Sequence, residues 1–291
     1  MRLTVLGLVA VVAAPLAAQQ QTDDVRIEVV PVAAGVHMLV GRGGNIGVSA
    51  GADGVFLIDD QFAPLTEKIV AAVRSISTDP IRFVLNTHWH GDHTGGNENL
   101  GSAGSLIVAH DNVRQRMSVE QFMEAFDRRV PASPVGALPV ITFSETVTFY
   151  LNGDTLHVFH VPHAHTDGDV IIHFRTANAL HMGDTFFNGR YPFIDVGSGG
   201  NVNGVIAAAE AGLAIADDAT RIIPGHGTLG GRAELVAYRD MLVAARDRIG
   251  QAMAAGQTLE QIRAAKLMAD YDATWGDSDG FVGFVFQSLQ R

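Results

Sequence analysis

Four potential metal ligands stand close together in the segment THWHGDHT (87–94). The segment follows an apolar run of strand type, so it lies where a strand leaves the core, which is a common place for a functional site. Side chains alternate along an extended chain, so His88 and His90 point to the same side and can reach one cation. The glycine that follows permits a sharp turn, after which Asp92 and His93 can face a second cation. This segment alone therefore predicts a strand end that addresses two metal ions.

Three later segments, each at the end of a β-type run, supply further ligands: VPHAHTDGD (161–169) carries His165, LHMGDT carries Asp184 and IIPGHG carries His226. Two metals with three protein ligands each and a shared bridging group need about this inventory. The chain has no cysteine, so every ligand must be a nitrogen or an oxygen. His163 is an alternative to His165, since it lies two residues away on the same side of an extended segment, but the motif favours His165.

The order of strand-type and helix-type segments indicates the fold. Short β segments separated by Gly-containing turns open the chain and predict an antiparallel sheet. A helix and further strands follow, and the last third is helical. This order predicts an α/β (α+β) protein, a four-layer αββα sandwich. The expected strands are 25–32, 35–41, 45–51, 54–60, 81–87, 105–110, 141–151, 155–162, 169–174, 179–184 and 221–227, and the expected helices are 64–75, 111–127, 203–217 and 232–253.

The first 18 residues have the layout of a secretory signal peptide. Arg2 precedes an apolar run to Ala14, and small residues lead to Ala18. The run is shorter than the roughly 20 residues needed to cross a bilayer. We therefore expect export to the periplasm, with residues 1–18 removed, 19–291 forming one domain and no membrane attachment afterwards. An uncleaved N-terminal anchor is the alternative.

Charge narrows the class of partner. The chain has 31 acidic residues against 20 Lys and Arg, a net charge of −11, and no basic cluster. Nucleic acid and anionic lipid are poor partners for such a surface. We expect a small-molecule substrate.

The ligand segments resemble those of a known family. HWHGDH matches the motif HxHxDH of the metallo-β-lactamase superfamily, HTD at 165–167 matches its third histidine, and GD and PGHG match its remaining ligands. The resemblance implies two metal ions, most simply Zn²⁺, although iron or manganese suits the same donors. Asp59 in LIDD would support the ligands from behind. The implied ligands are His88, His90 and His165 on the first metal and Asp92, His93 and His226 on the second, with Asp184 bridging or on the second.

The resemblance also implies hydrolysis. Two metals lower the pKa of bound water from about 15.7 towards 7, so that hydroxide can attack a polarised carbonyl near neutral pH. Asp92 would be the catalytic residue that orients this nucleophile. The sequence predicts β-lactamase-like hydrolysis, with a thioester or lactone hydrolase of the glyoxalase II type as an alternative. A non-catalytic periplasmic metal-binding partner protein is a third hypothesis, which the open metal positions argue against.

Signals for the substrate are fewer. Asn201, in GSGGNVNG, and Arg190 are expected to bind substrate, Arg190 by pairing with a carboxylate. Against a lactam, the familiar lactamases have cysteine in place of Asp184 and lysine in place of Phe187. Three apolar residues at helical spacing within 111–127 are interpreted as a buried helix face, with a lid as the alternative: Phe122, Met123 and Phe126.

Overall fold

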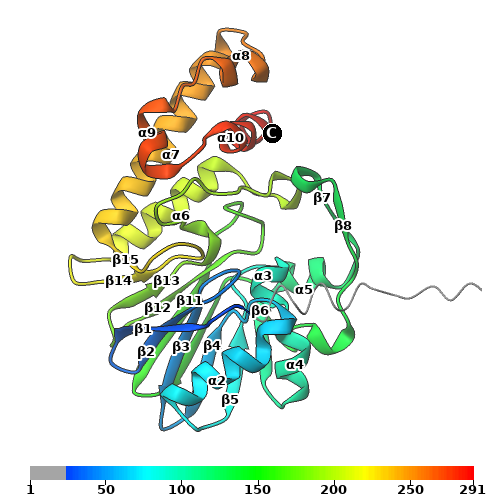
Figure 1. The fold of residues 1–291 in the computed structure, drawn as a ribbon, viewed down its shortest axis with the longest axis vertical. Coiled ribbons are helices and arrows are strands. Elements are labelled where there is room, and N and C mark those ends of the chain that lie inside the picture. Colours follow the sequence, from blue (N-terminus) through cyan, green and yellow to red (C-terminus); the bar gives the residue numbers. More distant parts are fainter. Residues whose placement is uncertain (1–23) are drawn as a thin grey trace, which may run out of the picture.

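The computed structural model describes residues 24–291 and contains two β-sheets that face each other, with helices on both outer sides (Figure 1). This is the αββα arrangement that the segment order predicts. The expected signal peptide lies within residues 1–23, outside the described residues. None of the helices in the described part of the chain is both long and apolar enough to cross a membrane.

The first sheet has the order β1-β2-β3-β4-β5-β6-β9. Its first four strands are antiparallel neighbours joined by tight turns, whereas β4, β5, β6 and β9 run parallel. Parallel neighbours require crossovers, and helices supply the first two. The strands are Glu28–Ala33 (β1), Val36–Val40 (β2), Ile46–Gly51 (β3), Gly54–Ile58 (β4), Ile81–Leu85 (β5), Leu106–His110 (β6) and Ile141–Phe143 (β9).

The second sheet has the order β10-β11-β12-β13-β14-β15, antiparallel except for the β13–β14 pair. The expected strand 141–151 is divided between the sheets, because the chain leaves β9 and enters β10 across a two-residue step. The strands are Thr146–Leu151 (β10), Asp154–His160 (β11), Val170–Phe174 (β12), Ala179–His181 (β13), Arg221–Ile223 (β14) and Gly230–Gly231 (β15).

Three apolar layers hold the sandwich together. One fills the space between the sheets, where Phe56 and Leu85 from the first sheet meet Ile172 and Phe174 from the second. The other two lie outside, beneath the helices that cover each sheet. The first sheet is covered by Thr66–Ile76 (α2) and Asn97–Ser102 (α4), and the second by Val202–Ile215 (α6) and Arg232–Ala254 (α7).

The expected helix over 111–127 is wrong in its second half. Helix α5 covers only Asp111–Met117, and a hairpin of β7 (Gln121–Met123) and β8 (Arg128–Val130) follows. The Gln121 side chain closes the helix end by donating to the carbonyl of Arg116 and accepting from its guanidinium. Asp127 adopts the left-handed conformation that the hairpin turn needs.

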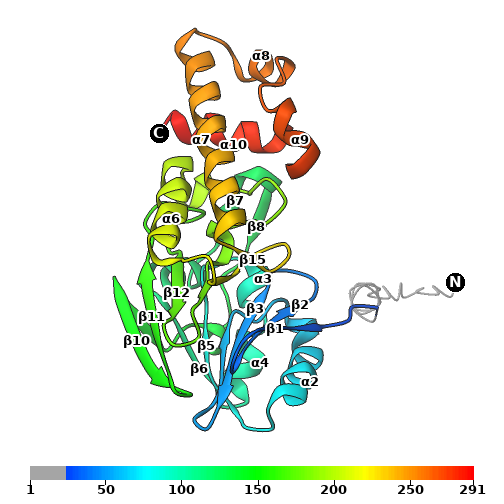
Figure 2. The ribbon, with the colours of Figure 1, turned by 90° about the vertical axis from the view of Figure 1, so that its left-hand side faces the viewer.

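The chain ends in three helices that the sequence analysis did not anticipate: Leu259–Ala264 (α8), Ala269–Trp275 (α9) and Asp279–Leu289 (α10). They gather beside the long helix α7, at the end of the molecule away from the β1–β4 hairpins (Figure 2). Helix α10 packs against α6 and α7. Its Phe284 contacts Phe193, whose ring in turn contacts His165.

Candidate metal centre

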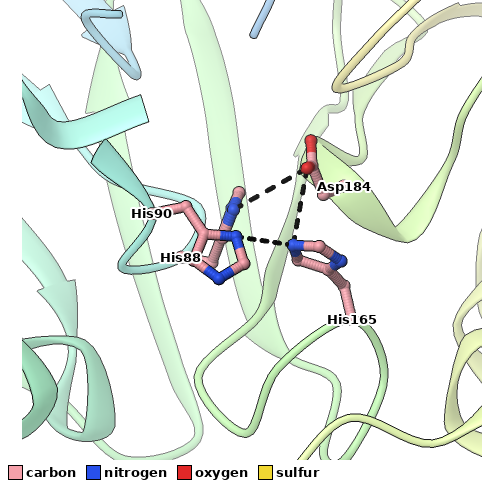
Figure 3. A group of neighbouring side chains, drawn as sticks. All are labelled: His88, His90, His165 and Asp184. Atoms are coloured by element: carbon pink, nitrogen blue, oxygen red, sulfur yellow. Dashed lines mark hydrogen bonds and ion pairs between the residues drawn. The ribbon is translucent and has the colours of Figure 1, made fainter. Parts of the chain in front are cut away.

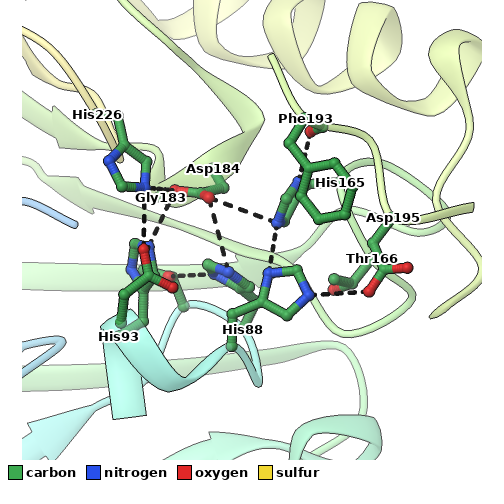
Figure 4. Close-up of polar contacts among 12 residues, drawn as sticks. His88, His93, His165, Thr166, Gly183, Asp184, Phe193, Asp195 and His226 are labelled. Atoms are coloured by element: carbon green, nitrogen blue, oxygen red, sulfur yellow. Dashed lines mark hydrogen bonds and ion pairs between the residues drawn. The ribbon is translucent and has the colours of Figure 1, made fainter. Parts of the chain in front are cut away.

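All seven predicted ligands lie at one edge of the sandwich, each just beyond the end of a strand. His88 and His90 follow β5, and the short helix Gly91–Thr94 (α3) carries the next two ligands. His165 lies in the loop between β11 and β12, Asp184 follows β13 and His226 follows β14. The strands end at the same edge, so residues up to 138 positions apart in the sequence converge there, as Figure 3 and Figure 4 show.

The first group contains His88, His90, His165 and Asp184, whose ligand atoms all lie within 4.8 Å of one another. His165 Nε2 lies 2.9 Å from His90 Nδ1 and 3.4 Å from Asp184 Oδ2 (Figure 3). His88 Nε2 lies 3.8 Å from the same carboxylate oxygen. All four residues are buried, so the group is a compact set of three imidazole nitrogens and one oxygen.

The second group contains Asp92, His93 and His226. His226 Nε2 lies 3.3 Å and His93 Nε2 3.7 Å from Asp92 Oδ2. Asp184 also faces this group, because its Oδ1 lies 3.1 Å from His93 Nε2 and 3.5 Å from His226 Nε2. Asp184 thus turns one carboxylate oxygen toward each group, which is the geometry of a bridging ligand (Figure 4).

Unpartnered buried atoms show that the two groups suit cations. His88 Nε2, His93 Nε2 and Asp184 Oδ1 are buried and have no hydrogen-bond partner. Such atoms cost free energy unless something coordinates them. A divalent cation in each group would satisfy them, and a set of imidazoles and carboxylates fits zinc, iron or manganese. The residues present therefore fit two metal ions.

Asp59 fixes the orientation of two ligands from behind, as the resemblance implies. Its Oδ2 lies 2.7 Å from His93 Nδ1 and accepts from the hydroxyl of Thr87 at 2.8 Å. Because that hydroxyl gives its proton to Asp59, its lone pair is left to accept from His88 Nδ1, 3.1 Å away. Both histidines then keep their protons on Nδ1 and present the Nε2 lone pair to a cation.

The other two histidines of the first group have partners that the sequence did not reveal. Asp195 Oδ2 lies 2.9 Å from His90 Nε2, which leaves His90 Nδ1 to face the group. The carbonyl of Phe193 lies 2.8 Å from His165 Nδ1. Both partners belong to one loop, so a single segment positions two ligands.

The histidines of the two ligand groups differ in their pKa values. Burial lowers the pKa of His88 and lowers that of His165 to about 4, so both are neutral. Burial acts to raise the pKa of Asp184, but the neighbouring histidines, foremost His226, hold it well below its usual range. Burial also acts to lower the pKa of His226, but Asp184 and Asp92 outweigh it and raise the value to about 9. Without a cation, the second group therefore retains a proton that a metal must displace.

The ligand pattern and the sequence agree on the family. A sequence model described as the metallo-beta-lactamase superfamily matches residues 39–226, a span that contains every ligand. The chain belongs to the metallo-β-lactamase superfamily.

Among curated relatives of this metallo-β-lactamase-fold chain are two named hydroxyacylglutathione hydrolase. The one from Polaromonas sp. is 32% identical over 165 residues, covering 56% of this chain and 55% of the relative. The one from Nitrosococcus oceani is 32% identical over 150 residues, covering 50% and 48%. The chain thus spans about half the length of the curated relatives it matches.

Solved structures show the same fold. The sec-alkylsulfatase Pisa1 from Pseudomonas sp. has a TM-score of 0.68 at 18% identity, covering 92% of this chain and 51% of that one. The DIM-1 metallo-beta-lactamase has a TM-score of 0.60 at 19% identity, covering 76% and 100%. Family membership and the two ligand groups together indicate a metal-binding member of this superfamily.

In this metallo-β-lactamase-fold chain a cavity of about 370 Å³ adjoins the centre. Both ligand groups border it through His90, Asp92, Asp184 and His226. The β7–β8 hairpin forms one wall of this cavity. Met123 and Phe126, which were expected on a buried helix face, therefore line the cavity, in agreement with the alternative interpretation as a lid. We call this cavity the aromatic pocket, because Phe62, Trp89, Phe126, Phe187 and Phe193 line it, together with Met123, Arg128 and Val130 of the hairpin.

The predicted substrate residues have different positions. Arg190 lies outside the aromatic pocket but lines a neighbouring cavity that His226 also borders. The structure does not bring Asn201 to either cavity. Its side chain caps α6 by accepting from Asn203 N at 2.9 Å, and its amide donates to the carbonyl of Ser288 at 2.9 Å. The prediction for Asn201 rested on the similarity of the surrounding sequence, whereas in the structure its side chain hydrogen-bonds the backbone at the start of α6, as Asn commonly does at a helix N-cap.

His163 is not part of the centre. Its backbone has a left-handed φ of 52°, and its Nδ1 lies 3.2 Å from the carbonyl of Gly199. This turn separates it from His165, with which it would share a face in an extended segment.

Proposed function

We propose that this enzyme hydrolyses an acyl thioester or a lactone whose acyl part is apolar. The observation that carries the proposal is the aromatic pocket, which is bordered by both ligand groups and lined by five aromatic side chains besides the ligands. Phe187, in the place of the lysine of familiar lactamases, stacks on His226 with ring centroids 5.1 Å apart. An uncharged ring there favours an apolar group over a carboxylate close to the metals.

The relatives support the same choice. Their name, hydroxyacylglutathione hydrolase, denotes cleavage of an acyl–glutathione conjugate, and each of the two is 32% identical to this chain over at least half of its length. The signal peptide expected at 1–18 favours a periplasmic location, so a substrate other than a glutathione conjugate fits the proposal better. β-Lactam hydrolysis is the second candidate, which a periplasmic location favours.

The residues have distinct roles in this reaction. His88, His90 and His165 would hold one metal ion, Asp92, His93 and His226 the other, and Asp184 both; we take the metal to be zinc. When bound, the metals supply Lewis acidity and make water nucleophilic at neutral pH. Burial acts to raise the pKa of Asp92, but His93 and His226 lower it to about 2. Its ionised carboxylate borders the aromatic pocket and can accept a hydrogen bond from the attacking water, orienting it toward the carbonyl.

The aromatic walls contribute in two ways. They bury the apolar acyl part, and they exclude bulk water from the carbonyl, which strengthens electrostatic interactions at the centre. Because water is the nucleophile in this proposal, no acyl-enzyme is needed. The carbonyl carbon takes its new oxygen from water, and the leaving sulfur or oxygen takes up a proton.

The test compares substrates and variants in the purified, zinc-loaded protein lacking residues 1–18. Thioesters, lactones and a chromogenic cephalosporin are assayed with the wild type and with the variants Asp184→Ala and His165→Ala. We expect thioester or lactone turnover that both substitutions abolish. His163→Ala is the matched control, because this exposed histidine lies two residues from His165 and should leave turnover unchanged.

Other results would change the conclusion. Turnover of the cephalosporin alone would favour the β-lactam candidate. Two bound metals without hydrolysis of any substrate would overturn the proposal and favour the non-catalytic hypothesis. Metal analysis of the protein as isolated would identify zinc, iron or manganese.

A further inference from the structure

A second cavity, of about 450 Å³, lies beside the metal centre. It is formed by β1, β2, the loop after Asp184 and the start of β14, segments that are distant in the sequence. His226 is the one ligand that borders both this cavity and the aromatic pocket. We call it the arginine groove, because Arg190 and Arg221 both line it.

Neither of the two guanidinium groups that line the groove is held by a carboxylate of the described residues. Several other arginines are held by carboxylates, as Arg116 is by Asp167 at 2.7 Å and Arg248 by Asp270. Within residues 24–291, by contrast, neither Arg190 nor Arg221 has an ion-pair or side-chain hydrogen-bond partner. Glu28 is the one acidic residue that lines the groove, and it pairs with neither. Two unpaired cations that line one cavity can bind an anionic group.

The groove adjoins the residues of the aromatic pocket at Gly43. Gly43 lines the groove, and a Cβ atom at this position would lie 3.1 Å from the carbonyl oxygen of Asp92 and 3.2 Å from the ring of Phe62. Asp92 and Phe62 both line the aromatic pocket. Gly43, with a left-handed φ of 120°, therefore packs closely against two residues of the aromatic pocket. Since His226 borders both cavities, a substrate that extends from the aromatic pocket past this side chain would enter the groove.

We propose that the leaving portion of the substrate carries an anionic group, a carboxylate or a phosphate, that Arg190 and Arg221 bind. This inference rests on the proposed function. The carbonyl lies at the centre, where both ligand groups border the aromatic pocket, and the apolar acyl part occupies that pocket. Only His226 among the ligands reaches the groove, so the groove holds a part of the substrate away from the carbonyl.

Hydrolysis of such a substrate breaks one bond to the carbonyl carbon and forms another. The bond between the carbonyl carbon and the leaving sulfur or oxygen breaks, and a bond from that carbon to the oxygen of water forms. One proton of the water goes to the leaving thiol or alcohol, and the other is released from the carboxylic acid product. From a thioester, the acyl acid leaves from the aromatic pocket and the anionic thiol from the groove, whereas a lactone opens to a single hydroxy acid that spans both.

The kinetic test uses thioesters of one apolar acyl group with three thiols: 3-mercaptopropionate, 2-mercaptoethanol phosphate and neutral 2-mercaptoethanol. For Arg190→Ala and Arg221→Ala we expect the KM of at least one anionic substrate to rise by about tenfold, since a charge-assisted hydrogen bond is lost. The kcat/KM of the neutral substrate should stay within about twofold, which a general structural defect would not allow. Which anionic substrate responds distinguishes carboxylate from phosphate. Arg74→Ala, at the end of α2, is the matched control and should change neither the KM of the anionic substrates nor the kcat/KM of the neutral one.

A binding test separates this inference from the proposed function. The thioethers 3-(methylthio)propionate and 2-(methylthio)ethyl phosphate cannot be hydrolysed, and calorimetry should show that the zinc-loaded protein binds one of them and that both arginine substitutions weaken this binding. If no thioester is cleaved but this binding is seen, the proposed function fails and the anion site stands. If all three thioesters are cleaved and the arginine variants treat them alike, the inference is wrong while the proposed function survives.

Discussion

Asp59 and His93 form a fully buried pair in which the carboxylate Oδ2 lies 2.7 Å from Nδ1 of the imidazole. The second oxygen of Asp59 accepts from the backbone N of Thr87, the residue that precedes the first ligand. Asp59 itself has a left-handed φ of 64°, an uncommon conformation for a residue other than glycine. One carboxylate at the end of β4 thus positions ligands of both metal groups.

Replacing this carboxylate should weaken metal binding. We expect Asp59→Asn to lower metal affinity by about 10- to 100-fold, because an amide orients His93 and Thr87 less well and no longer strengthens the imidazole as a donor. Competition with a chromogenic chelator measures the affinity. Asp79→Asn, an exposed control, should change nothing. An affinity equal to that of the wild type in Asp59→Asn would show that Asp59 does not position the ligands.

Asp195 should play a similar part for the first group alone. Its contact with His90 Nε2 holds that ring so that Nδ1 faces the group. Asp195→Asn is expected to lower the affinity of the first metal by about tenfold and to leave the second within about twofold. Titration of the metal-free protein with Co²⁺, followed by absorbance, resolves the two steps. An equal loss at both sites would contradict this assignment.

The ligands could be predicted from the sequence because each lies in a short local pattern at the end of an apolar strand. Asp195 could not, since a lone aspartate in YPFIDVG has no motif and acquires its role only when the loop reaches His90, 105 residues earlier. Asp59 was found through the resemblance, not through local spacing. Positioning residues depend on tertiary contacts, which spacing along the chain does not encode.

The residues that line the two cavities could not be predicted from the sequence for a related reason. Phe122, Met123 and Phe126 have helical spacing, but the segment pairs with β8 as a hairpin, and tertiary pairing overrode the local pattern. Arg190 and Arg221 lie 31 residues apart and share a cavity only because the loop after Asp184 and strand β14 meet there. The fold class followed from the order of segments, whereas pocket walls followed from how loops pack.

Metal affinity at the second group should increase with pH. In the metal-free protein Asp184 and Asp92 raise the pKa of His226 to about 9, so at neutral pH its imidazole is protonated and a cation must displace that proton. Each rise of one pH unit between about pH 6 and about pH 8 should strengthen this step by at least about tenfold. The first group should respond less, because burial lowers the pKa of His88 and His165. Co²⁺ titrations at several pH values measure both steps, and the same pH slope for both would contradict the prediction.

The hairpin offers a pair of phenylalanines that separates a role in binding from a role in folding. Phe126 lines the aromatic pocket and contacts Phe193, with ring centroids 5.1 Å apart. Phe122, on the same hairpin and similarly exposed, lies outside the pocket and packs under the guanidinium of Arg129. The two side chains therefore differ in the surface they contact rather than in their size or exposure.

We expect Phe126→Ala to raise the KM of an apolar thioester or lactone substrate by about tenfold, because the acyl part loses roughly 1.5 kcal/mol of apolar contact. Phe122→Ala should leave KM within about twofold. Both substitutions should change the free energy of unfolding by less than about 1 kcal/mol, since both rings are largely exposed. Steady-state kinetics with acyl groups of increasing length tests the assignment, as the defect in Phe126→Ala should grow with the acyl chain. A defect that is equal in the two variants, or independent of acyl length, would mean that the hairpin does not bind the acyl group.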